Sequence, residues 1–184
     1  ANFSEHGANR LGANALLQGL VDGYFILPTT LGNYLANTEL KPLKNSQSEF
    51  SEAIQGNKLF IQKLTSIKGN TLADVLHDKL GKIMWNTCSM SRNKEKLQQA
   101  LIEITKIKEE FWNHLKIPTN ASTLNQELEK AARIADYIEL AELMCRDALA
   151  REESCGSHFR EEYQTDNGDP KRNDKDFGHI ACWQ

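Results

Sequence analysis

Apolar residues recur every three or four positions along the middle of the chain, which is the spacing of one face of an α-helix. Four helical segments are predicted between residues 46 and 150. The first opens with a Ser46–Glu49 capping box and closes at Gly69, and the second opens with Thr71 and Asp74. A break at 89–93 precedes the third, which ends at Pro118, and Thr123 with Gln126 caps the fourth. The positions expected in the core are Phe50, Ile54, Leu59, Ile61, Leu64 and Ile67, then Val75, Leu76, Leu80, Ile83, Met84 and Trp85, then Leu97, Leu101, Ile104, Ile107 or Lys108, Phe111 and Leu115, and finally Leu124, Leu128, Ala131, Ala135 and Ile138.

The N-terminal part is more apolar. A helix is predicted over Leu16–Leu27, and Pro28 is expected to end or kink it because proline has no backbone N–H. Gly19 and Gly23 stand four residues apart, which predicts close approach of another backbone and tight burial. A short helical piece over Leu31–Ala36 follows, and residues 37–45 are typical of a linker.

Beyond Arg151 the chain becomes charged and loses helical periodicity, and the run from Asp166 to Pro170 indicates a turn. Phe177 and Trp183 suggest that this tail docks on a surface, which need not belong to this chain. The predicted fold is mostly α: a three- to four-helix bundle with extended ends. No strand-like alternation is long enough to build a sheet.

Composition narrows the class of protein. The 184 residues carry a net charge of −3, which gives no electrostatic reason to bind nucleic acid or anionic lipid, and no apolar run is long enough to span a bilayer. None of the four cysteines has CxxC spacing, so free thiols are expected rather than a metal site. Neighbouring carboxylates such as Glu152 and Glu153 are expected on a solvated face.

The candidate chemistry lies in the opening run from His6 to Leu16, HGANRLGANAL. The guanidinium of Arg10 suits a carboxylate held by two hydrogen bonds. Small residues and a helix N-terminus behind it suit an anion or the electron-rich edge of a ring. The alternative is a surface Arg10 with Asn14 as a helix cap. No GxGxxG run exists for a dinucleotide-binding unit.

This run resembles the HGANRLGxNSL stretch of the flavoprotein subunits of succinate dehydrogenase and fumarate reductase, with Ala15 in place of serine. A second run, from Arg151 to Tyr163, is similar to the family's RxESRGAHxRxDY signature, with Cys155 where arginine is usual. The relative L-aspartate oxidase carries a similar opening stretch. The ending from Arg172 to Trp183 favours the complex-forming branch, where a similar RDDxxFxxH ending occurs.

The resemblance implies hydride transfer between FAD and succinate or fumarate. It implies that Arg10 binds a substrate carboxylate and that Asn14, Ala15 and Leu16 contact the flavin, the last two through backbone atoms. The family's nucleotide-binding glycines, proton-donating arginine and substrate histidines lie in motifs that this sequence lacks. The resemblance therefore implies a C-terminal fragment without a catalytic residue of its own, expected to be inactive and to bind FAD weakly or not at all. His158 and Arg160 are expected to form a structural hydrogen-bond network rather than part of an active site.

The implied partners are an iron–sulfur subunit and a membrane-anchor subunit, which would hold the protein at the cytoplasmic face of the membrane. The implied domains are a remnant of the FAD-binding domain with a linker over 1–45, a helical domain over 46–154 and a tail over 155–184. The first helix is expected to have lost its packing partner and to self-associate through Leu16–Leu27. The competing interpretations are an L-aspartate oxidase fragment and a stand-alone helical interaction module.

Overall fold

The computed structural model describes residues 14–44, 47–118, 125–179 and 181–183. The chain divides into two compact units, Ala1–Glu52 and Ala53–Gln184, each with its own set of contacts. Among the described helices, none is both long enough and apolar enough to cross a membrane.

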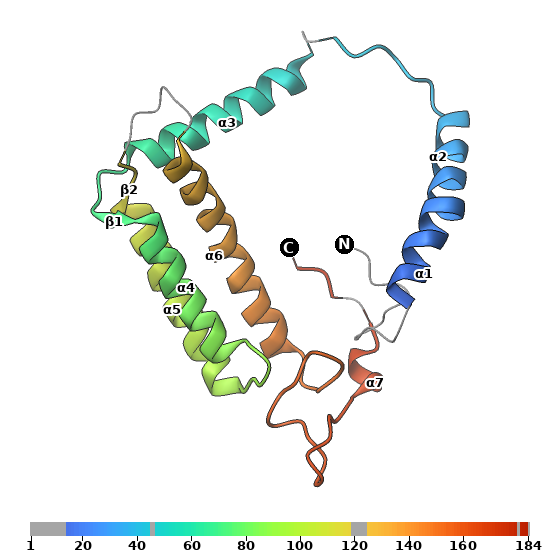
Figure 1. Cartoon of the computed structure of the whole chain (residues 1–184), viewed down its shortest axis with the longest axis vertical. Helices are drawn as coiled ribbons and strands as arrows, with labels where there is room; N and C mark the ends of the chain where they lie inside the picture. The colour runs from blue at the N-terminus through green and yellow to red at the C-terminus, as the bar shows by residue number, and fades with distance from the viewer. Residues whose placement is uncertain (1–13, 45–46, 119–124, 180, 184) are drawn as a thin grey trace. The chain divides into compact units, whose positions relative to one another are not determined.

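The first unit contains one long run of helical turns. It comprises α1 (Asn14–Val21), a π-helical turn η1 (Asp22–Ile26) and α2 (Leu27–Ala36) (Figure 1). The π turn is closed by the backbone N–H of Leu27, which donates to the carbonyl of Asp22 five residues earlier. Pro28 lies in the first turn of α2, where its missing N–H costs least. Pro28 therefore coincides with a change of helix type rather than a break.

The second unit is built on three helices that pack side by side (Figure 1). They are α4 (Ala73–Thr87), α5 (Lys94–His114) and α6 (Gln126–Ala150). The expected helical bundle is confirmed. Asn93 caps α5 by accepting from the N–H of Lys96, and Asn125 caps α6 by accepting from the N–H groups of Glu127 and Leu128. The buried residues predicted from periodicity include Leu64, Leu76, Leu80, Leu97, Ile104, Ile107, Phe111, Leu115, Ala131 and Ile138.

A two-residue parallel ladder closes one end of the bundle. Strand β1 (Thr71–Leu72) pairs with β2 (Leu115–Lys116), with Thr71 opposite Leu115. Gly69 lies against this corner, and a β-carbon added there would come within 1.9 Å of the carbonyl oxygen of His114. Gly69 is therefore needed for close backbone approach, in addition to following the end of α3 (Ser48–Ser66).

Several apolar positions predicted to be buried are exposed, because only the end of α3 reaches the bundle core. Leu64 is its one buried residue, whereas Phe50, Ile54, Leu59 and Ile61 are 42–56% exposed. Val75 and Trp85 of α4 are also exposed, at 44% and 77%. Gly19 and Gly23 face open space rather than another backbone within the described residues. Periodicity finds an apolar face but not the partner that covers it.

The helix caps predicted from the sequence differ in part from those in the structure. Leu72, not Thr71, is the N-cap of α4, and the hydroxyl of Thr71 donates instead to Glu110 of α5. Because the hydroxyl of Thr71 is engaged by this tertiary contact, it does not cap α4. Ser46 of the first predicted capping box, the Thr123 cap and the Leu124 core position lie outside the described residues.

The tail docks on the chain itself. The indole N–H of Trp183 donates to the carboxylate of Asp147 in α6 at 3.0 Å, and the guanidinium of Arg151 lies 5.8 Å from the ring centre of Phe177. A single helical turn, α7 (Asp174–Phe177), appears where no helical period was found, capped by Asn173.

Candidate functional site

The opening motif is only partly visible. Arg10 and His6 lie outside the described residues. Asn14 and Ala15 are half-buried at the start of α1, and Leu16 is 75% exposed. The three residues predicted to contact a flavin thus occupy a single helical turn, and their roles stay predictions.

The second motif is organised around Arg160, a buried cation at the C-terminal end of α6. Its side chain is 1% exposed, and Nη1 donates to the carbonyl oxygens of Ala148 and Leu149 at 2.7 and 3.2 Å. The last carbonyls of an α-helix lack partners within the helix and carry partial negative charge. Arg160 therefore supplies the cap that α6 cannot make from its own residues, and Nε pairs with Glu162 at 3.1 Å.

A buried carboxylate holds the start of the tail. Glu153 is 2% exposed and accepts from the guanidinium of Arg151 at 2.6 Å and from the backbone N–H of Asn173 at 2.9 Å. Burial alone would raise the pKa of Glu153, but these two donors together hold it below its ordinary value. The expectation of a solvated Glu153 is wrong, because sequence neighbours do not reveal that residue 173 folds back onto it.

His158 bridges two parts of the second unit. Its Nδ1 lies 3.0 Å from Nη1 of Arg92, and its Nε2 lies 3.0 Å from the carbonyl oxygen of Arg151. Because a guanidinium only donates, Nδ1 must accept, and Nε2–H therefore donates to the carbonyl. Burial, followed by the charges of Arg92, Arg160 and Arg151, lowers the pKa of His158, and the imidazole is neutral near pH 7.

The loop after α4 is tied to the same segment. The hydroxyl of Ser91 and the amide of Asn93 donate to the two carboxylate oxygens of Glu161 at 2.7 and 2.8 Å, and these bonds lower the pKa of Glu161. The backbone N–H of Lys94 donates to Glu162. Arg92 and Arg160 also form a parallel bridge.

This hydrogen-bond network joins the end of α6, the loop at 88–93 and the tail. Each of its charged side chains is hydrogen-bonded to another group of the chain. The hydrogen-bond network expected around His158 and Arg160 is present. Sequence reasoning missed Arg92 and Asn173, and only the density of polar residues around each hinted at a role. Within the described ranges, no cluster of three or more His, Cys, Asp or Glu could hold a metal ion.

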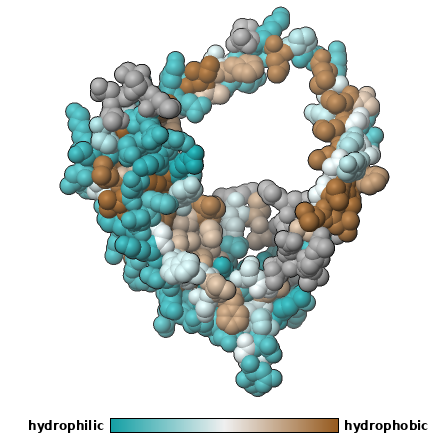
Figure 2. All heavy atoms as spheres, in the orientation of Figure 1, coloured by the Kyte–Doolittle hydropathy of each residue, from teal (hydrophilic) through white to brown (hydrophobic). Residues whose placement is uncertain are grey.

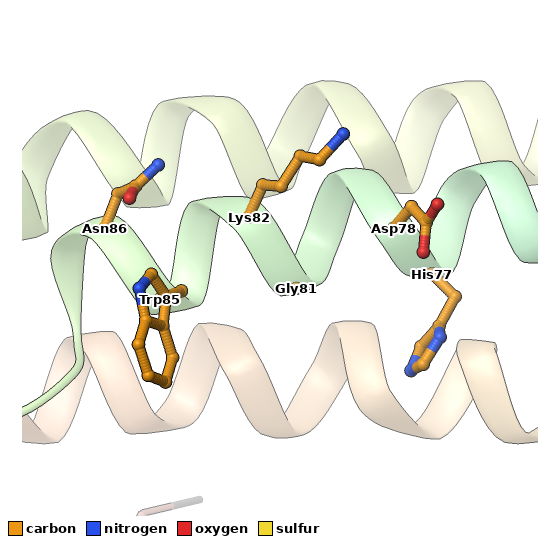
Figure 3. A pocket seen from close by; sticks show the side chains of 6 residues that line it. All are labelled: His77, Asp78, Gly81, Lys82, Trp85 and Asn86. Atoms are coloured by element: carbon orange, nitrogen blue, oxygen red, sulfur yellow. The ribbon is translucent and has the colours of Figure 1, made fainter.

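A shallow groove runs along α4. Figure 3 shows His77 and Trp85 projecting from one edge of the helix, with Gly81 between them. Lys82 and Asn86 project from the opposite edge in this view. Next to it, Leu80, Met84, Tyr137, Leu140, Ala141 and Met144 line an apolar depression between α4 and α6. His77 packs against Tyr137, with ring centres 5.8 Å apart. The depression between α4 and α6 thus offers mainly apolar contact, whereas the groove along α4 is lined mostly by polar side chains.

The helical bundle and its tail have the fold of the C-terminal helical domain of flavoprotein subunits. The family described as "Fumarate reductase flavoprotein C-term" matches residues 77–184, more than half of the chain. The chain belongs to this family. The resemblance noted from the two sequence motifs is thereby confirmed.

Individual relatives are consistent with membership of this family. The chain is 31% identical over 178 residues to the succinate dehydrogenase flavoprotein subunit of Rickettsia conorii, covering 96% of this chain and 28% of the relative. It is 30% identical over 175 residues to the L-aspartate oxidase of a Synechocystis species, covering 87% of this chain and 29% of the relative. A solved structure of E. coli quinol fumarate reductase superposes with a TM-score of 0.74 and 26% identity, covering 94% of this chain and 28% of that one.

The chain spans between a quarter and three tenths of the length of the curated relatives it matches. The relatives are named as flavoprotein subunits of fumarate reductase and succinate dehydrogenase, and this chain matches only part of each.

Proposed function

We propose that this chain is the C-terminal helical part of a fumarate reductase or succinate dehydrogenase flavoprotein, with Arg10 gripping a carboxylate of the dicarboxylate substrate. The match over residues 77–184, together with a bundle of the same fold, carries this proposal. The HGANRLG run supports the role of Arg10, because a guanidinium binds a carboxylate through two parallel hydrogen bonds.

The start of α1 supports the proposed flavin contact. Ala15 adds only a methyl group to the first helical turn, so a flat ring could approach the backbone there. The backbone N–H groups of a first helical turn have no partner within their helix and suit the electron-rich edge of the ring. When bound, FAD would supply the acceptor or donor of the hydride. Asn14, Ala15 and Leu16 would orient the ring, and Arg10 would hold the substrate.

The exposed apolar surface of the first unit supports a missing partner. Leu16, Leu17, Leu20 and Tyr24 are 58–75% exposed, and Asp22 is the only charged residue from 14 to 36. Figure 2 shows hydrophobic side chains gathered along α1 and α2. An FAD-binding domain of a longer protein would cover this surface. In the chain alone, a second copy would do so through Leu16–Leu27, and FAD would bind weakly or not at all, leaving the chain inactive.

The same proposal extends to the partner subunits and to the location of the protein in the cell. Electrons would leave the flavin for an iron–sulfur subunit, and a membrane-anchor subunit would hold the assembly on the cytoplasmic side of the membrane. The names of the fumarate reductase and succinate dehydrogenase relatives support this branch.

The test is Arg10→Gln in the protein that carries this chain together with a complete FAD-binding domain. We expect kcat/KM for succinate and fumarate to fall roughly 100-fold, because a charge-assisted bidentate pair is lost, while the bound FAD content stays unchanged. Arg133→Gln is the matched control, since Arg133 is an exposed arginine that pairs with Glu129 on the same helix. Equal turnover of the Arg10 variant and the parent would refute the role of Arg10.

L-aspartate oxidase is the second candidate, favoured by the 30% identity to the Synechocystis enzyme. Comparing turnover of L-aspartate and succinate by the same complete protein separates the two. Turnover of aspartate with none of succinate would transfer the chain to the oxidase branch.

A further inference from the structure

Two cysteines far apart in the sequence meet inside the bundle. Cys88 follows the last turn of α4 and is 5% exposed, and Cys145 lies in α6 and is 0% exposed. Sγ of Cys88 lies 4.0 Å from the carbonyl oxygen of Met144, the residue before Cys145, and Sγ of Cys145 lies 3.8 Å from Sδ of Met84, one helical turn before Cys88. The two thiols therefore face the same short stretch of the interface between α4 and α6.

A cation stands beside the pair. The guanidinium of Arg92 is anchored by Nε, which donates to the carbonyl of Ser89 at 2.9 Å, and its charge acts on both sulfurs. The hydrogen bond from Cys145, with help from Arg92, lowers the pKa of Cys88 to about 7 in spite of burial. The same hydrogen bond and burial raise the pKa of Cys145. Cys88 is thus the thiol of the pair that loses its proton first.

We propose that Cys88 and Cys145 form a redox-responsive dithiol that a peroxide converts to an intramolecular disulfide, fastening the end of α4 to α6. The Cys88 thiolate attacks one oxygen of hydrogen peroxide, the O–O bond breaks, and the departing hydroxide takes a proton to leave as water. Cys88 is then a sulfenic acid. The sulfur of Cys145 attacks that of Cys88 and loses its proton, the S–O bond breaks, and a second water leaves. Two thiols are oxidised by two electrons and one peroxide is reduced.

The other two cysteines are placed differently. Cys155 is half-buried in the turn that precedes His158, and Cys182 is exposed near the end of the tail. A disulfide needs two sulfurs that can approach bonding distance without backbone movement. Among the described thiols, Cys88 and Cys145 are the two whose sulfurs both lie against the interface between α4 and α6. Because both are buried, the oxidation requires local opening at the end of α4 to admit a small peroxide.

The experiment uses the full chain with Cys155→Ser and Cys182→Ser, which removes the two thiols outside the pair. The protein is treated with hydrogen peroxide, its remaining thiols are blocked with N-ethylmaleimide, and it is digested without reductant for mass spectrometry. We expect a peptide joining Cys88 to Cys145, lighter than its reduced components by two hydrogen atoms. Dithiothreitol should reverse the change.

The same treatment in concentrated urea is the control for folding. The joined peptide should become scarce there, because the pairing depends on packing of α4 against α6. Cys145→Ser should leave Cys88 alkylated or oxidised alone, with circular dichroism confirming its helical content. Native protein that yields both cysteines alkylated, or Cys88 as sulfinic acid without a joined peptide, overturns the proposal. So does equal pairing in urea.

Discussion

At the scale of single residues, the second unit shows how a polar tail is held without an apolar core of its own. Arg160 and Glu153 are almost fully buried, yet each is engaged by several partners. A buried charge is tolerated only when paired and hydrogen-bonded. His158 joins this network as a neutral imidazole, which makes it the group that acid should disturb first.

The free energy of unfolding should therefore fall at acidic pH, where His158 is protonated more readily in the unfolded chain than in the folded one. The pKa of His158 lies below its ordinary 6.5 in the folded chain, so below that pH the unfolded state binds more protons and stability falls with decreasing pH. The slope is at most about 1.4 kcal/mol per pH unit. The free energy of unfolding, measured in urea between pH 7.5 and 5, should show this loss in the parent.

His158→Asn is the matched variant, because its amide oxygen can still accept from Arg92 but does not titrate. Its stability should change less over the same pH range. The paired carboxylates Glu153 and Glu161 have lowered pKa values, so their contribution is lost at more acidic pH, below about 4.5. Identical curves for parent and variant between pH 7.5 and 5 would show that His158 does not control the loss.

At the scale of elements, the sequence pattern predicts where the helices lie, whereas contacts with distant residues decide how some of them end. α5 was predicted almost in full, because its apolar residues keep strict i, i+3, i+4 spacing and Asn93 caps it. The C-terminal end of α6 has no local cap of this kind. Instead Arg160, ten residues beyond it in the tail, binds its carbonyls.

Arg160→Ala tests that arrangement. Removing the side chain leaves carbonyls of α6 without this donor and removes the ion pair with Glu162, and we expect a loss of about 3–5 kcal/mol in the free energy of unfolding. Hydrogen exchange should show that residues 151–177 lose protection first. Arg172→Ala is the control, since Arg172 pairs with Asp174 in solvent, and its urea midpoint should match the parent. A midpoint for Arg160→Ala that equals this control would mean that the cap is dispensable.

At the scale of the whole molecule, the two units differ in kind. The second buries a continuous core, whereas α1 and α2 of the first contain no buried residue. Large exposed apolar surface marks an interaction site in soluble proteins. This contrast supports a longer protein in which the first unit is covered.

The chain alone should therefore self-associate, and a double substitution Leu17→Glu with Leu20→Glu should abolish association. Two charges placed at an apolar interface would be buried without partners. Thr29→Glu with Asn33→Glu adds the same charge to exposed polar positions of α2 and should leave association unchanged. Sedimentation equilibrium over a range of concentrations measures both. A parent chain that stays monomeric throughout would remove self-association from the proposal.

Sequence alone determined the helical class, most of the helix positions and the family, because helical hydrogen bonds are local and the two motifs are contiguous runs. It did not reveal which apolar faces are covered, as the exposed Phe50 and the buried Leu64 on the same helix show. Nor did it reveal the burial of Glu153 or the contact of Cys88 with Cys145. Those features join residues separated by long stretches of chain, and only the packing of α4, α5 and α6 with the tail brings them together.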